Sequence, residues 1–444
     1  MKLQTSPAGV ALGVVAAASL ALAASPAFAE AAPPRIDAAD TAWMIAATGL
    51  VLMMTIPGLA LFYAGMVRKK NVLATMAQSL ACTMLCSILW FAVGYSLSFV
   101  GDGPWLGTFE RAFMRGTTME SVSPLATTIP EMLFMMYQMT FAIITVALIS
   151  GAVADRMRFS AFLWFAGAWL LVVYVPIAHW VWGGGFLAKA GLLDFAGGTV
   201  VHLNAGIAGL VAAYVVGKRY GYGTDNFSPH NLGLAVIGTG LLWVGWFGFN
   251  GGSALGANSR AAYAIAATHL AASAGALTWM ALEWGIRGKP SVLGMISGAI
   301  AGLGTITPAS GFVLPWHGVV IGVTAGAFCF WACTWLKLKI GYDDSLDVFG
   351  VHGVGGATGT LLTGVFAVAA LSMSPDSPEG SAGLIEGNAR QVLIQLYGIV
   401  ATLIWSGVLT FVLLKVIEFM VPLRVSQQQE IEGLDVTQHG EALQ

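Results

Sequence analysis

The chain has 444 residues, of which 57% are hydrophobic and only 9% are charged. A soluble domain typically carries about 25% charged residues, so this chain has too little charge to cover a water-exposed surface. With 20 basic against 22 acidic residues, it also lacks the basic excess of a nucleic-acid-binding protein. The composition therefore excludes a soluble enzyme and a disordered protein. It predicts an all-α integral membrane protein that crosses the bilayer several times.

Residues 1–29 are typical of a cleaved secretory signal peptide. Lys2 is followed by a short apolar stretch over 8–24 and by an Ala-x-Ala cleavage pattern at 27–29. These are the n-region, h-region and cleavage site of a signal peptide rather than the features of a spanning helix. We expect the mature chain to begin at Glu30, outside the cytoplasm.

The remaining chain contains eleven apolar segments, and a helix needs about 20 apolar residues to cross a bilayer. The predicted spans are 40–66, 72–100, 126–153, 159–181, 199–217, 231–250, 260–284, 291–309, 313–336, 348–371 and 391–421. An external N-terminus and eleven spans place the C-terminal tail inside. The loops then expected in the cytoplasm are rich in Lys and Arg, as the positive-inside rule requires. These basic residues are Arg68, Lys69, Lys70, Arg156, Arg158, Lys218, Arg219, Arg287, Lys289, Lys337 and Lys339.

A short motif occurs twice, at the starts of the fifth and tenth segments. His202 and His352 each follow a valine and precede small residues at the same spacings. Each motif also follows an aspartate, Asp194 in the first case and Asp347 in the second. Because the two segments enter the bilayer from opposite sides, we predict two inverted five-helix repeats plus a last helix. This plan is common in transporters, with the binding site near the midplane.

The polar groups within the segments are mainly histidines and hydroxyls, and no chain of carboxylates crosses the membrane. A pump that moves charge through the bilayer usually needs such carboxylates. A neutral imidazole donates a hydrogen bond at one nitrogen and accepts one at the other. His202 and His352 are therefore predicted to guide a small polar molecule or to relay a proton. The alternative for each is a structural histidine.

Aromatic residues near the segment ends have two interpretations. The first is interfacial anchoring and packing. The second is a cation site, because an aromatic face attracts an ammonium-type cation by up to about 2 kcal/mol when desolvated. A hydroxyl such as Ser253 could then accept a hydrogen bond from the cation. The aromatic residues concerned include Trp180, Trp182, Trp243, Trp246, Phe247 and Phe249.

The four cysteines form two pairs at helical spacing inside apolar segments, at Cys82 and Cys86 and at Cys329 and Cys333. This spacing is neither a CxxC nor a zinc-binding pattern. We interpret them as packing residues, and we expect no metal site and no cofactor.

Longer motifs resemble a known family. The stretch 194–202 (Asp-Phe-Ala-Gly-Gly-Thr-Val-Val-His) resembles the signature of ammonium transporters of the Amt/Mep/Rh superfamily. Similar stretches cover nearly the whole mature chain and lie at 58–65, 179–184, 246–250, 343–353 and 432–441. The resemblance to bacterial members implies an ammonium or ammonia transporter rather than an enzyme. It also implies a homotrimer with one pore per subunit, in the bacterial inner membrane, that serves nitrogen uptake.

The resemblance assigns roles to aromatic and hydroxyl residues. Phe141, Trp182 and Ser253 match the site that recruits ammonium at the outer face. Phe141 and Phe249 match the stacked pair that closes the pore.

The resemblance also assigns roles to polar residues of the pore. His202 and His352 match the twin histidines that line it. Asp194 matches an acid near the recruitment site with a structural or electrostatic role, and its place just before the fifth segment favours a helix cap. Tyr137 stands where family members often carry phenylalanine.

The tail, residues 424–444, is polar and acidic, and a polar terminus is commonly solvated and disordered. The resemblance favours instead an ordered regulatory segment beneath the pore, with a PII-type signalling protein as its partner at the cytoplasmic face. Residues 30–423 would form the transport domain. Alternative functions are a Rhesus-like gas channel, an ammonium sensor and a haem-binding electron carrier. Trp182 and Ser253 argue against the first of these.

Overall fold

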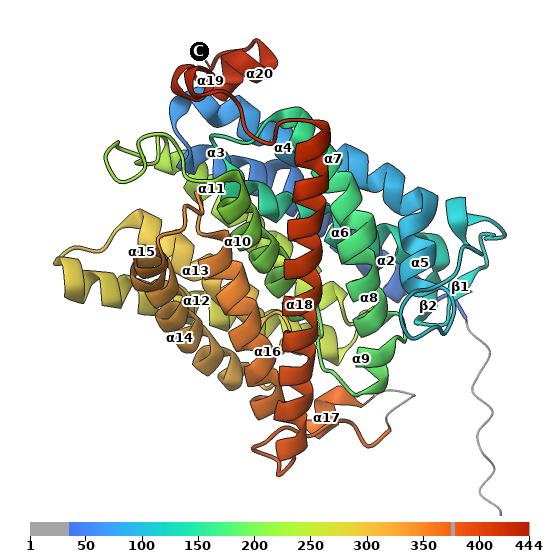
Figure 1. Cartoon of the computed structure of the whole chain (residues 1–444). Helices are drawn as coiled ribbons and strands as arrows, with labels where there is room; N and C mark the ends of the chain where they lie inside the picture. Colours follow the sequence, from blue (N-terminus) through green and yellow to red (C-terminus); the bar gives the residue numbers. More distant parts are fainter. Residues whose placement is uncertain (1–34, 374–377, 444) are drawn as a thin grey trace, which may run out of the picture. The chain divides into compact units, whose positions relative to one another are not determined.

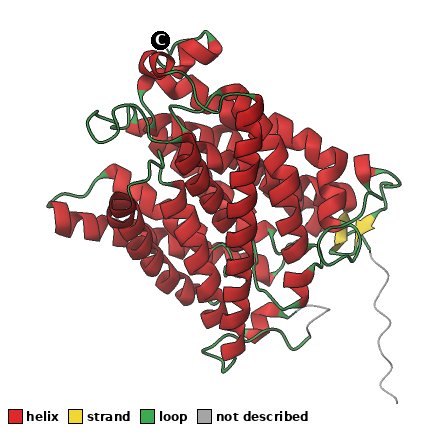
Figure 2. Cartoon of the chain, viewed as in Figure 1, coloured by secondary structure: helices red, strands yellow, loops and turns green. Residues whose placement is uncertain are grey.

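The computed structural model describes residues 35–373 and 378–443. The predicted signal peptide, residues 1–29, lies outside the described residues. Figures 1 and 2 show long helices lying side by side, together with one small antiparallel sheet of β1 (Val122–Ser123) and β2 (Ala126–Pro130). The fold class is therefore all-helical, as predicted.

The helices follow the predicted apolar segments in order. They are α2 (Ala38–Met53), η1 (Met54–Leu59), α3 (Ala60–Met66), η2 (Lys69–Asn71), α4 (Val72–Leu89), η3 (Trp90–Gly94), α5 (Tyr95–Phe99), η4 (Ala112–Met114), α6 (Glu131–Val153), α7 (Phe159–Trp169), η5 (Leu170–Tyr174), α8 (Val175–Trp182), α9 (Phe186–Lys189), η6 (Gly198–Leu203), α10 (Asn204–Val216), α11 (Leu232–Trp246), η7 (Phe247–Gly251), α12 (Ser259–Arg287), α13 (Val292–Ile306), α14 (Pro315–Trp331), η8 (Ala332–Leu336), α15 (Lys337–Ile340), η9 (Phe349–Gly353), α16 (Val354–Phe366), α17 (Ala369–Ser372), α18 (Ala389–Met420), α19 (Gln427–Glu432) and α20 (Leu434–His439).

Within the described part of the chain, nine helical stretches are long and apolar enough to cross a membrane. The other two predicted spans are occupied by the shorter α13 and by η9 continued into α16. The chain is therefore a multi-pass membrane protein. The count of eleven crossings and their orientation stay predictions.

Two predicted segments have different limits in the structure. The third was expected to begin at 126, but residues 126–130 form β2 and α6 begins at Glu131. Three β-branched residues precede Pro130 there, and both features disfavour helical backbone. The tenth was expected to reach 371, but α16 ends at Phe366 because the backbone of Ala367 leaves the helical region, with ψ 133°.

The loops that follow alternate helices meet at the end that carries the tail, which is the upper end in Figure 1. Arg68, after α3, lies 3.2 Å from Asp155, after α6. Asp155 in turn lies 3.6 Å from Arg219, after α10. Arg219 then pairs with Asp343, after α15, at 2.7 Å.

The intervening loops meet at the opposite end, near α9 and α17. The backbone N–H of Phe186 donates to the carbonyl of Pro104 at 3.1 Å, and that of Phe195 donates to Pro308 at 3.0 Å. Successive loops therefore alternate between the two ends of the molecule, because each long helix runs from one end to the other.

The repeated motif marks a close helix crossing. A Cβ on Gly206 would lie 2.2 Å from the Cα of Gly353, and a Cβ on Gly356 would lie 2.6 Å from the backbone nitrogen of Leu203. The contacts are reciprocal, since α10 packs against η9 and α16 against η6. Small residues are required here because they let two helix backbones approach closely. The crossing places the two motif histidines side by side.

Candidate functional site

Three cavities follow one another through the helices, and the two nearer the tail share lining residues. The outer cavity, of about 290 Å³, lies at the end opposite the tail and is lined by Phe141, Trp182 and Ser253 among others. The inner cavity, of about 240 Å³, lies toward the tail. Between them lies a narrow cavity of about 10 Å³, barely the volume that one water molecule needs. His352 lines both the narrow and the inner cavity.

The outer cavity brings together the three residues predicted for recruitment. The indole N–H of Trp182 donates to the carbonyl of Asp194 at 2.8 Å, which fixes the ring. That ring stands perpendicular to Phe141, with 5.8 Å between ring centroids. The hydroxyl of Ser253 donates to the carbonyl of Phe249 at 2.8 Å, so its lone pairs remain free to accept. Aromatic rings and a hydroxyl acceptor on one cavity suit a small cation that carries N–H donors.

The rings of Phe141 and Phe249 separate the outer from the narrow cavity. Phe141 lies on α6 and Phe249 on η7, and the two rings stack with centroids 4.1 Å apart and planes 27° apart. Both side chains are buried. The predicted gate pair therefore lies together.

The two motif histidines also lie together. Their rings stack with centroids 5.2 Å apart and planes 15° apart, and their Nδ1 atoms lie 3.2 Å apart. At that distance the two nitrogens share one proton, so one ring donates at Nδ1 and the other accepts. His202 also stacks on Trp246 at 5.4 Å. Its Nε2 has no hydrogen-bond partner among the described residues and is available to a molecule in the passage.

The rest of the narrow cavity is apolar. Among the described residues, its lining carries no charged side chain, and the remaining lining residues are Met54, Leu59, Phe62, Ile144, Leu148, Val201, Leu242, Trp246, Phe249 and Ile300. An isolated ion entering such a space would lose tens of kcal/mol of hydration in the Born limit. A small neutral molecule that needs one or two hydrogen bonds is the species that this passage suits.

Asp194 caps the turn that carries His202. Its carboxylate accepts hydrogen bonds of 2.6–3.2 Å from the backbone N–H groups of Gly197, Gly198, Thr199 and Val200, and a further one from the Thr199 hydroxyl. Both carboxylate oxygens are thus occupied, which leaves little capacity for direct contact with a cation. This is the geometry of a helix cap.

The structural counterpart of Asp194 in the second motif is Asp344 rather than Asp347, the aspartate that most closely precedes that motif in the sequence. The Asp344 carboxylate accepts from the backbone N–H of Phe349 at 2.7 Å, at the start of the turn that carries His352. Asp347 instead pairs with Lys337 at 2.6 Å. Burial raises the pKa of Asp344. Asp344 precedes His352 by as many residues as Asp194 precedes His202. This equal spacing was the signal in the sequence that could have distinguished Asp344 from Asp347.

Helical turns of an unusual kind carry all three central side chains. His202, Phe249 and His352 lie on the π-helical turns η6, η7 and η9. Such turns occur frequently at functional sites. No residue periodicity in the sequence predicted them.

The family model described as the Ammonium Transporter Family matches residues 42–443. The chain belongs to the ammonium transporter family. The ammonium transporter of Bacillus subtilis is 48% identical over 402 residues, which cover 90% of this chain and 97% of the relative. That of Aquifex aeolicus is 48% identical over 416 residues, which cover 93% and 95%. The crystal structure of Saccharomyces cerevisiae Mep2 has a TM-score of 0.82 and 40% identity, and the match covers 89% of each chain.

Membership of the ammonium transporter family supports ammonium transport as the function, and the relatives are named transporters rather than enzymes. Within residues 35–373 and 378–443, no group of three His, Cys, Asp or Glu side chains could hold a metal ion.

One residue of the outer cavity was missed by sequence reasoning. Gln138 lines this cavity of the ammonium transporter and is only 8% exposed. Its amide oxygen has no hydrogen-bond partner among the described residues, and an unpaired buried polar atom is costly. A polar side chain one turn before Phe141 in an apolar helix was the available signal.

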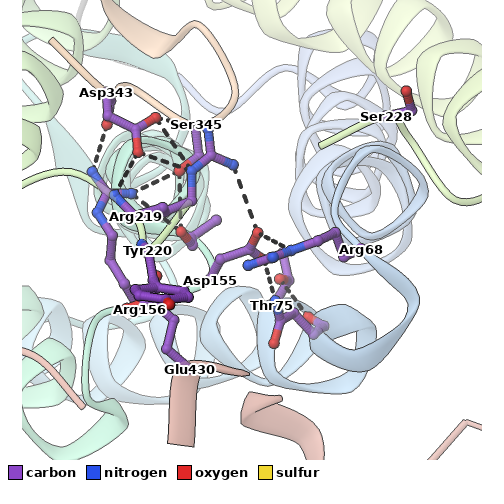
Figure 3. A network of polar contacts seen from close by, with 12 residues as sticks. Arg68, Thr75, Asp155, Arg156, Arg219, Tyr220, Ser228, Asp343, Ser345 and Glu430 are labelled. Carbon is purple, nitrogen blue, oxygen red and sulfur yellow. Dashed lines mark hydrogen bonds and ion pairs between the residues drawn. The ribbon is translucent and has the colours of Figure 1, made fainter. Parts of the chain in front are cut away.

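Below the inner cavity, buried charges join the loops of the tail end (Figure 3). Arg156 is fully buried and donates to the carbonyls of Gly217 and Asp343 and to the Ser345 hydroxyl, so it connects three loops. Burial lowers the pKa of Arg156 to about 10, so it stays charged at neutral pH. Burial alone would raise the pKa of Asp343, but hydrogen bonds from Arg219 and the charges of both arginines hold it below its ordinary value.

The tail of this ammonium transporter forms α19 and α20 and contacts the same end. Glu430 pairs with Arg424 at 2.7 Å and accepts from the backbone N–H of Tyr220 at 2.7 Å. The side-chain oxygen of Asn71 accepts from the backbone N–H of Leu434 at 2.8 Å. Asn71 also donates to Asp155 of the charged network. The tail is therefore connected to the loops beneath the inner cavity.

Proposed function

We propose that this protein takes up ammonium by binding it in the outer cavity, releasing one proton there and conducting ammonia through the narrow cavity. The observation that carries this proposal is the order of the three cavities. An aromatic and hydroxyl-lined cavity comes first, then a phenylalanine stack, then an apolar passage with two histidines.

Ammonium is selected in the outer cavity by both its charge and its N–H donors. The faces of Phe141 and Trp182 attract the cation, and the Ser253 hydroxyl accepts a hydrogen bond from it. The amide of Gln138 supplies a further acceptor once its oxygen turns toward the cavity. Potassium has no N–H groups, so it gains only the aromatic attraction and loses its hydration shell.

The proton is released before the narrow cavity because the charged form cannot be stabilised there. Cation–π contacts return at most about 2 kcal/mol each, whereas the desolvation cost of an isolated ion is in the tens of kcal/mol. Ammonium therefore leaves its proton on water in the outer cavity, and ammonia passes between Phe141 and Phe249. In the inner cavity ammonia takes up a proton again.

The histidine pair provides hydrogen bonds to ammonia in an otherwise apolar passage. His202 presents an unpaired Nε2, and His352 borders the inner cavity. Because the two rings share a proton between their Nδ1 atoms, each can be a donor or an acceptor without carrying a permanent charge.

The same proposal extends to assembly and regulation. The chain acts as a homotrimer with one pore per subunit in the bacterial inner membrane, after removal of residues 1–29, and serves nitrogen uptake. Residues 30–423 form the transport domain. The tail, residues 424–444, regulates the pore and contributes to binding of a PII-type signalling protein. The contacts of Glu430 and Asn71 support this role, since they connect the tail to the loops below the inner cavity.

The recruitment step is tested by the concentration dependence of uptake. Purified protein in proteoliposomes with an internal pH dye reports the initial rate at a series of ammonium concentrations. Ser253→Ala removes a hydrogen bond to a charged ligand, so the half-saturating concentration should rise about tenfold. Ser273→Ala, on α12 and away from the three cavities, is the matched control. An unchanged half-saturating concentration in S253A would contradict the recruitment site.

A further inference from the structure

The hydroxyl of Tyr137 lies behind the gate rather than in the passage. Tyr137 is fully buried on α6, one turn before Phe141, and the two rings meet edge to face at 5.0 Å. Its oxygen lies 2.8 Å from the carbonyl oxygen of Phe249 and 2.9 Å from that of Gly248. It also lies 3.3 Å from the Ser253 hydroxyl. The side chain therefore connects the helix of one gate ring to the backbone of the other.

The carbonyl of Phe249 depends on side chains for its hydrogen bonds. It lies at the end of η7, where backbone N–H groups that would normally continue the helix are directed elsewhere. Those of residues 252–254 donate to the carbonyls of Gly248, Asn250 and Gly251. Among the described residues, the hydrogen bonds to the Phe249 carbonyl thus come from two hydroxyls, those of Tyr137 and Ser253.

From this geometry we propose that Tyr137 is a positioning residue of the gate. Its hydroxyl holds the Phe249 carbonyl and so keeps the Phe249 ring stacked on Phe141, which sets how readily the stack opens. The inference rests on the proposed function, because it assigns a gating role within the same transport path. Tyr137 does not line the outer cavity, and the Ser253 hydroxyl is held by its own hydrogen bond to Phe249 at 2.8 Å, so Tyr137 acts on passage through the gate rather than on recruitment.

The prediction separates rate from affinity. Tyr137→Phe removes one of the two hydrogen bonds that fix Phe249, so displacing the ring becomes easier. The maximum uptake rate should rise about fivefold, the factor that corresponds to one ordinary hydrogen bond. The half-saturating ammonium concentration should stay unchanged, in contrast to S253A. A merely structural role would lower thermal stability and leave both kinetic constants in place.

The matched control is Tyr174→Phe. Tyr174 is also fully buried, but its hydroxyl has no hydrogen-bond partner among the described residues, so Y174F should change neither constant. Gly252→Ala tests the same contact from the other side, because a Cβ there would lie 2.6 Å from the Tyr137 oxygen and displace it. G252A should raise the maximum rate as Y137F does.

The experiment measures initial uptake rates and thermal unfolding of the full-length wild type and the three variants, in proteoliposomes and in detergent respectively. A higher maximum rate in Y137F and G252A, with Y174F equal to the wild type, supports the positioning role. An unchanged maximum rate in folded Y137F, or a change confined to the half-saturating concentration, would overturn it. Absence of ammonium-dependent signal in the wild type would instead refute the proposed function.

Discussion

Asp194 precedes His202 by as many residues as Asp344 precedes His352, and each carboxylate accepts hydrogen bonds from the start of the turn that carries its histidine. The two caps act on turns that cross at close-packed glycines. Together they fix the directions in which the two imidazoles point. The 3.2 Å separation of the Nδ1 atoms is the consequence of both caps and of the crossing.

Removal of the Asp344 carboxylate, which caps the turn of His352, should change the orientation of the His352 ring. In Asp344→Ala the N–H of Phe349 loses its acceptor, so the protein should be destabilised by about 0.5–2 kcal/mol, the usual cost of a lost cap. Selective uptake should fall because the His352 ring is no longer fixed. Thermal unfolding and proteoliposome uptake measure the two effects. Asp347→Ala, which removes only the pair with Lys337, is the control and should have the smaller effect on uptake; a larger effect in D347A would restore Asp347 as the counterpart of Asp194.

Substitution of both pore histidines should abolish selective conduction. His202→Ala with His352→Ala removes both imidazoles of the narrow cavity. The indole N–H of Trp246, which also lines it, already donates to Thr307, so ammonia would cross without a hydrogen-bond partner. Uptake of ammonium and of potassium, measured side by side, reports the loss. His269→Ala, at an exposed position against Trp243 and outside the linings of the three cavities, is the control. Retained selective uptake in the double variant would contradict the role given to the pair.

The Asp343–Arg219 pair should make the free energy of unfolding depend on pH in the acidic range. The folded protein holds the pKa of Asp343 below its ordinary value. The pair therefore stabilises the fold fully at pH values above the ordinary pKa of an aspartate, which is about 3.9. The contribution is lost as the pH falls below it toward the folded pKa. Asp343→Ala should cost roughly 3–5 kcal/mol at neutral pH, since it removes the closer of the two carboxylates that pair with the buried Arg219. Glu418→Ala breaks an exposed pair and should cost about 1 kcal/mol or less. Thermal unfolding of both variants between pH 7 and pH 3 measures these costs. Equal losses of stability in the two variants would contradict the prediction.

Glu430 should control docking of the tail. Glu430→Ala removes the contacts to Arg424 and to the backbone of Tyr220, so α19 should detach. Proteolysis should then cut the tail faster, binding of a PII-type protein should change, and the thermal stability of the long helices should be nearly the same. Glu432→Ala, at an exposed position on the same helix, is the matched control. If E430A and E432A are cut at the same rate, Glu430 does not hold the tail.

The membrane-spanning segments and the histidine pair were predictable from local sequence. Continuous apolar stretches mark spanning helices by length alone, and the repeated motif identified His202 and His352 as partners. The cap by Asp194 was also predictable, since an aspartate just before a helix commonly accepts from its first N–H groups.

Other features depend on contacts that no single segment encodes. The π-helical turns follow from how helices pack, because a wholly apolar segment has no periodicity that distinguishes a π turn from an α turn. Asp343, Asp344 and Asp347 are close in sequence, and only their partners Arg219, Phe349 and Lys337 separate their roles. The hydroxyl of Tyr137 likewise acquires its role from η7, which is distant in the chain.

The most direct measurement is the response of wild-type proteoliposomes on a solid-supported membrane to a jump in ammonium, with internal pH recorded in parallel and with sodium and potassium jumps as controls. Ammonium alone should give a signal. A current would show that charge crosses as well and would make the pair of His202 and His352 the candidate proton route, whereas internal alkalinisation without current would show passage of neutral ammonia. Equal signals for potassium, or neither current nor pH change with ammonium, would contradict selective transport through this pore.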